Sequence, residues 1–64
     1  MPYVNIKITD EDVSQAQKTT LIKETTELLS RVLNKDPATT FVVIDEVNLD
    51  NWGVSGKSVT ELRN

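Results

Sequence analysis

Residues 3–9 read Tyr-Val-Asn-Ile-Lys-Ile-Thr, and this short stretch predicts the first element of the fold. Val4, Ile6 and Ile8 alternate with polar residues, and the β-branched side chains favour extended backbone. Such a period of two is typical of a strand with one covered face and one open face. We therefore expect a half-buried strand at the amino end.

A helix is expected next, because apolar residues recur there at helical spacing: Leu21, Ile22, Leu28, Leu29, Val32 and Leu33. Ser14 and, three residues later, Gln17 match a capping box, with Asp12 as the rival cap. Asn34 is a suitable last residue, and Pro37 cannot continue a helix.

A second strand follows at 41–44, where Phe-Val-Val-Ile is an unbroken apolar run ended by Asp45 and Glu46. An unbroken run predicts a strand that is covered on both faces. Strand, helix and strand form a βαβ unit with parallel strands and a right-handed crossover, so the fold class is α/β. Residues 48–56 indicate a tight turn or short hairpin, and residues 57–64 have no clear form.

Composition excludes several classes of function. The 64 residues contain neither cysteine nor histidine, which removes disulfides, the usual zinc sites and His-based triads. A net charge of −3 disfavours nucleic acid and anionic membrane surfaces as partners, because both are negatively charged. No apolar run is long enough to span a membrane, and no signal peptide is visible. We expect one domain over residues 1–64, in the cytoplasm and without a cofactor.

The predicted unit is too small to be stable alone. A two-stranded sheet with one helix leaves one sheet face and both edges uncovered. Without disulfides or metals, association with further copies of the chain is the remaining way to cover them. The sequence therefore predicts a homo-oligomer with a core between subunits.

Pro2 is the residue with the most distinctive chemistry. Removal of Met1 would leave a secondary amine, and an α-amino group titrates near 8. Burial or a nearby cation lowers that value toward neutrality, where a general base is most effective. Composition and spacing alone favour the simpler interpretation that Pro2 merely begins a strand.

The chain resembles the 4-oxalocrotonate tautomerase family from end to end. The resemblance runs through residues 1–8, Gln17-Lys18, Leu21-Ile22, residues 42–46 and Asp50-Asn51-Trp52-Gly53-Val54-Ser55-Gly56-Lys57. It implies βαβ subunits whose dimers form a four-stranded sheet with two helices, commonly assembled as a hexamer, a trimer of dimers. It also implies Pro2 as the base that moves a proton between enol and keto forms of a 2-oxo acid.

The resemblance extends to part of the substrate pocket. It implies that Trp52 supplies an apolar wall near the C-terminal hairpin. Two arginines of the family are absent: residues 11–13 stand in place of one, and Phe41 stands in place of the other. A guanidinium holds a carboxylate through two charge-assisted bonds, so a dianionic substrate is disfavoured here.

Other residues are candidates for partial replacement of those arginines. Lys35 precedes the second strand and Thr39 offers a hydroxyl, so both join Phe41 and Trp52 as candidate substrate-binding residues. Lys7 and Lys57 are further cations that other subunits could bring to the site. A monoacid with an apolar tail is the expected substrate.

Two other functions remain open. The amine, when protonated, would support hydration or dehalogenation of an unsaturated acid if Asp45, Glu46 or Asp50 activated water. The scaffold would be a non-catalytic oligomer if Met1 were retained, because an amide nitrogen is not basic.

Overall fold

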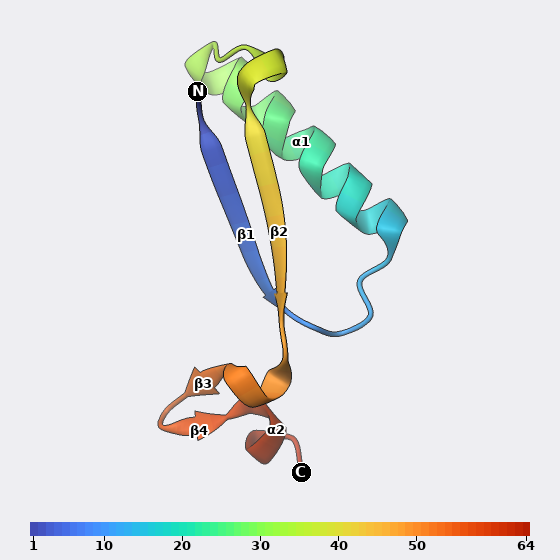
Figure 1. Cartoon of the computed structure of the whole chain (residues 1–64), viewed down its shortest axis with the longest axis vertical. Helices are drawn as coiled ribbons and strands as arrows, with labels where there is room; N and C mark the ends of the chain where they lie inside the picture. Colours follow the sequence, from blue (N-terminus) through green and yellow to red (C-terminus); the bar gives the residue numbers. More distant parts are fainter.

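A computed structural model describes all 64 residues of the chain (Figure 1). Its elements are β1 (Tyr3–Thr9), α1 (Gln15–Leu33), the 3₁₀ turn η1 (Pro37–Thr39), β2 (Phe41–Val47), the 3₁₀ turn η2 (Leu49–Asn51), β3 (Gly53–Val54), β4 (Lys57–Ser58) and α2 (Val59–Leu62). The predicted βαβ unit is confirmed. Neither α1 nor α2 combines the length and the hydropathy that a membrane-spanning helix needs.

The two long strands are parallel and paired along their whole length, from Tyr3 opposite Phe41 to Thr9 opposite Val47. The prediction that the second strand ends before Asp45 is wrong, because the strand continues to Val47. Ion pairs made by the acidic side chains inside the strand, described below, compensate for their charge.

The ends of α1 are those that the sequence indicates. The Ser14 hydroxyl accepts from the Gln17 amide at 3.1 Å, and the Gln17 side chain accepts from the Ser14 amide at 2.9 Å. Asp12 is therefore not the cap. Asn34 ends the helix in the left-handed conformation, with φ of 55°. Both caps satisfy backbone groups that a helix end otherwise leaves free.

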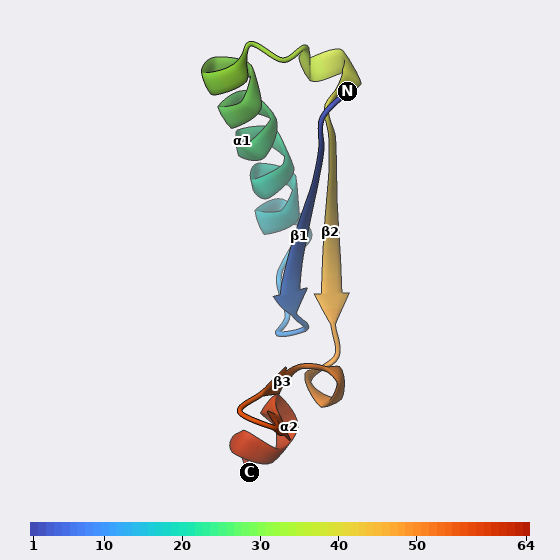
Figure 2. The ribbon, with the colours of Figure 1, turned by 90° about the vertical axis from the view of Figure 1, so that its left-hand side faces the viewer.

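α1 covers one face of the β1–β2 sheet and leaves the other face open (Figure 2). Tyr3, Phe41 and Val43 on the open face are 64%, 50% and 45% exposed. In the single chain, the expectation that the second strand is covered on both faces is therefore wrong. The apolar run of β2 is covered by α1 on one face of the sheet and is open on the other face.

No residue of the chain is buried. The radius of gyration is 14.8 Å, whereas a compact chain of this length has a value of about 11 Å. The accessible surface is 4855 Å², against about 4,100 Å² for a compact monomer of this mass. A single chain thus has apolar patterning without an enclosed core.

Residues 48–64 form a separate small unit, the C-terminal module, beyond the end of the sheet that is remote from the N-terminus (Figures 1 and 2). β3 and β4 form an antiparallel hairpin. Its turn has positive φ at Ser55 (55°) and Gly56 (80°), as a two-residue hairpin turn requires. α2 begins with a second capping box, between Ser58 and Glu61. The segment of unclear form is thus a strand and a helical turn.

Candidate functional site

Four of the five candidate site residues lie at one end of the sheet. Pro2 directly precedes β1, and Phe41 begins β2 beside it; the Phe41 amide donates to the Pro2 carbonyl oxygen at 3.0 Å. Lys35 and Thr39 lie in the connection that enters β2 at the same end (Figure 1). We call Pro2, Lys35, Thr39 and Phe41 the amino-end cluster.

Pro2 is fixed in position by the sheet. It is half-buried, and its carbonyl is the first acceptor of the β1–β2 ladder. Met1, which precedes it, is 83% exposed, so the Met1–Pro2 peptide bond lies at the surface of this end. While Met1 is present, the Pro2 nitrogen is an amide. Removal of Met1 would leave a secondary amine at the start of β1, one residue before the strand pairs with Phe41.

The polar members of the cluster differ in availability. The Thr39 hydroxyl donates to the Asp36 carbonyl at 3.3 Å, so it already has a partner within η1. Lys35 is exposed and its ammonium makes no ion pair. Arg31, in the last turn of α1, is likewise exposed and unpaired, so Lys35 and Arg31 are the cations of this end that are available to an anion.

Trp52 lies far from the amino-end cluster in the same chain. β2 separates them, and its seven residues span roughly 20 Å. Trp52 is half-buried at the start of the hairpin, and its carbonyl accepts from the Val59 amide at 2.8 Å. It lines a shallow hollow of about 260 Å³ with Lys7, Val47, Asn51 and Gly53. One chain does not bring Trp52 to Pro2.

The three carboxylates considered for activating water are all engaged. Asp45 accepts from the Lys7 ammonium at 2.6 Å, and Glu46 pairs with Lys18 of α1. Asp50 accepts from the Thr60 hydroxyl at 2.5 Å. Their side chains lie toward the Trp52 end of the sheet or beyond it.

Two ionisable groups have shifted pKa values, and neither belongs to the amino-end cluster. The hydrogen bond and charge of Asp45 raise the pKa of Lys7 above its ordinary value. Hydrogen bonds from Arg63 and then from Thr9 lower the pKa of Glu11. The spacing in the sequence gives no signal for the Glu11–Arg63 contact, because 52 positions separate the two residues.

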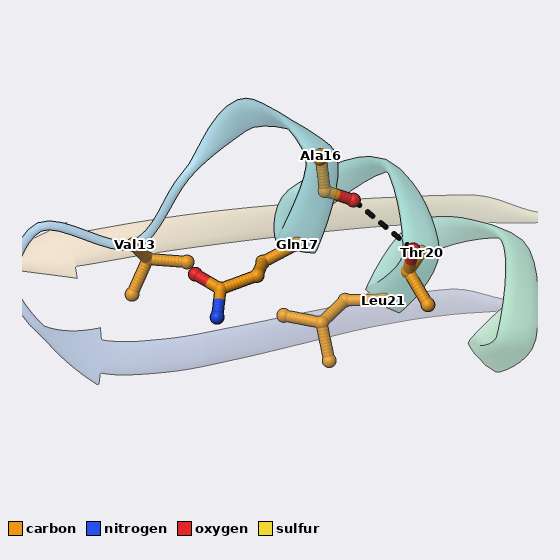
Figure 3. Close-up of a pocket in the computed structure, with 5 residues that line it drawn as sticks. All are labelled: Val13, Ala16, Gln17, Thr20 and Leu21. Carbon is orange, nitrogen blue, oxygen red and sulfur yellow. Dashed lines mark hydrogen bonds between the residues drawn. The ribbon is translucent and has the colours of Figure 1, made fainter.

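The largest hollow of the chain lies along the first two turns of α1, about 470 Å³ between Val13, Ala16, Gln17, Thr20 and Leu21 (Figure 3). The Thr20 hydroxyl donates to the Ala16 carbonyl at 3.0 Å, so the polar groups at its rim are partly satisfied. The hollow contains no ionisable side chain. No group of three or more metal-binding side chains occurs anywhere in the chain.

The fold and the placement of a proline directly before the first strand define a class of small α/β proteins, and comparison with known proteins identifies that class. The family model for the tautomerase enzymes matches residues 2–62. The chain is 57% identical over 63 residues to "Probable tautomerase K2" of Dickeya dadantii. The aligned residues cover 98% of this chain and 94% of the relative. The chain therefore belongs to the tautomerase family and is an enzyme of the isomerase type.

Solved structures agree with this assignment. The crystal structure of DmpI from Helicobacter pylori is 42% identical and superimposes with a TM-score of 0.89, covering 97% of this chain and 96% of that one. A heterohexameric 4-oxalocrotonate tautomerase from Chloroflexus aurantiacus is 27% identical, with a TM-score of 0.87 over 98% and 100% of the two chains. The tautomerase fold predicted from the sequence is confirmed.

Proposed function

We propose that this enzyme catalyses keto–enol tautomerisation of a 2-oxo acid, with Pro2 as the general base once Met1 has been removed. The observation that carries the proposal is the position of Pro2: half-buried, hydrogen-bonded through its carbonyl at the first rung of the sheet, and adjacent to Phe41. Membership of the tautomerase family supports the same chemistry.

The reaction needs only proton transfers. The Pro2 nitrogen takes a proton from an enol hydroxyl or from carbon next to a carbonyl, and returns it at another carbon, a 1,3- or 1,5-transfer. An amine titrates near 8 in water, and the apolar Phe41 and Trp52 side chains would disfavour the ammonium form. A general base is most effective when its pKa lies near the pH at which the enzyme works.

We infer that the complete site is shared between copies of the chain. Pro2 and Trp52 lie at opposite ends of a single sheet, so Trp52 would reach Pro2 from another copy. The absence of any buried residue and the exposure of Tyr3, Phe41 and Val43 on the open face of the sheet support self-association. The likeness to a heterohexameric tautomerase supports a hexamer built from dimers with four-stranded sheets, with a dimer as the smaller alternative.

We infer a substrate with one carboxylate and an apolar tail. Lys35 is an unpaired cation in the connection that enters β2 at the same end of the sheet as Pro2, and Phe41 offers a half-exposed aromatic face for the tail. A single ammonium holds one carboxylate as a point charge rather than through a planar fork. The Thr39 hydroxyl can exchange its backbone partner for a substrate oxygen at little cost, since the hydrogen bond to Asp36 is long.

The test is ketonisation of an aromatic enol pyruvate by Met1-free protein, with processing verified by intact mass. Pro2→Ala is expected to lower kcat by about 10²–10⁴, the usual contribution of a positioned acid–base group. Protein that retains Met1 should lose activity to the same degree. Equal rates for wild type and Pro2→Ala would contradict the proposal and leave the non-catalytic scaffold.

A further inference from the structure

The C-terminal module has one side-chain connection to the rest of the chain. The Arg63 guanidinium donates to the Glu11 carboxylate in the loop that follows β1. No other hydrogen bond or ion pair joins residues 48–64 to residues 1–47. This contact is therefore the one polar side-chain link that holds the module in its orientation on the sheet.

The Glu11 carboxylate is held on both oxygens. One accepts from Arg63, and the other accepts from the Thr9 hydroxyl at the end of β1. Thr9 belongs to the sheet and lies opposite Val47 of β2. The carboxylate is thus fixed to the sheet, and the guanidinium that binds it is fixed in turn.

A short path of hydrogen bonds connects Arg63 to Trp52. The Arg63 amide donates to the Val59 carbonyl at 3.1 Å, and the Val59 amide donates to the Trp52 carbonyl at 2.8 Å. The Thr60 hydroxyl ties α2 to η2 through Asp50. These bonds join α2, β3 and η2 into one hydrogen-bonded unit, so we expect a displacement of Arg63 to displace Trp52.

We propose that Glu11 and Arg63 are positioning residues that fix Trp52 relative to the sheet. The inference rests on the proposed function for its catalytic consequence, since Trp52 there completes the site of another copy. It also gives a structural role to Glu11, which stands in the segment that replaces a family arginine and whose charge Arg63 balances. Neither residue touches the substrate.

Trp52 is the only tryptophan of the chain, so its fluorescence reports its position directly. Glu11→Gln and Arg63→Gln are each expected to raise the acrylamide quenching constant of Trp52 by about twofold, because a charge-assisted bond that holds the module is lost. Glu27→Gln breaks the exposed pair with Lys23 on α1 and should leave quenching unchanged. Exchange of the charges, Glu11→Arg with Arg63→Glu, should restore most of the wild-type value.

Kinetics provide the second readout. Glu11→Gln should lower kcat for the enol pyruvate by about tenfold, as expected when a site residue is misplaced by a fraction of an ångström to an ångström. Wild-type quenching in both single variants would overturn the inference even if Pro2 proves catalytic. Failure of the charge exchange to restore quenching in a folded variant, as judged by circular dichroism, would overturn it as well. If Pro2→Ala leaves activity intact, the proposed function fails, while the quenching data still decide the role of Glu11 and Arg63.

Discussion

The amino end of the sheet and the C-terminal module are held in place by different means. Pro2 and Phe41 are fixed by a backbone ladder that continues through seven pairs of residues, with α1 packed on one face. Trp52 belongs to a module that one exposed ion pair attaches to the same sheet. Pro2, the proposed base, is placed by the backbone of the fold, whereas the placement of Trp52 depends on a side-chain contact.

This difference suggests how a chain of 64 residues can make an enclosed site without a core of its own. In the proposed site, the rigid part carries Pro2, whose position would decide the chemistry. The module that projects from it carries Trp52, which in that proposal reaches another copy. Exposed ion pairs contribute little to stability, but they can fix orientation when nothing else does.

The largest effect on stability is expected in the rigid part. Ile44→Ala removes a half-buried side chain that faces α1 and should lower the free energy of unfolding by about 2 kcal/mol, the low end for loss of an aliphatic core side chain. Val54→Ala in the hairpin, where the side chain is 50% exposed, should cost less than about 1 kcal/mol. Urea unfolding of both variants checks the contrast, and equal losses would contradict it.

The two capping boxes allow a closer comparison. Ser14→Ala at α1 should cost about 1 kcal/mol of global stability, the usual value for a lost N-cap. Ser58→Ala at the short α2 should leave the midpoint of global unfolding nearly unchanged and should instead raise the quenching of Trp52. The opposite pattern, with Ser58→Ala the more destabilising, would show that the module is not the weaker part.

The smallest effect is a dependence on pH. The folded-state pKa of Glu11 lies below its unfolded value, because Arg63 and then Thr9 donate to the carboxylate. The stabilisation is therefore present above the unfolded pKa, about 4.3, and is lost as the pH falls through the lowered folded pKa. Trp52 quenching should rise over that acidic range in wild type and lack this step in Glu11→Gln. Identical pH profiles would contradict the role of this pair.

Much of the fold follows from local patterns. The alternation in β1, the Ser14–Gln17 capping box and Asn34 at the helix end each act through neighbours a few residues away. The sequence does not predict the extension of β2 to Val47, because charged residues usually end a strand. Here Asp45 and Glu46 find partners on β1 and α1, which only the tertiary arrangement supplies.

The candidate site likewise has one part that local patterns predict and one part that depends on the tertiary arrangement. The nearness of Pro2, Phe41, Thr39 and Lys35 follows from the parallel register of β1 and β2, which a βαβ unit dictates. The distance of Trp52 and the contact of Arg63 with Glu11 depend on how the C-terminal module turns beyond β2. No periodicity or motif encodes that turn, so reasoning from the sequence could not supply it.

Mixing two inactive variants tests the shared site most directly. Pro2→Ala and Trp52→Ala chains, each of low activity alone, are unfolded together in equal amounts and refolded. If the two residues come from different copies, roughly one quarter of the sites regain both, and the mixture recovers roughly one quarter of wild-type activity. Activity no higher than the mean of the two separate variants would show that Pro2 and Trp52 act within one chain and would contradict the shared site.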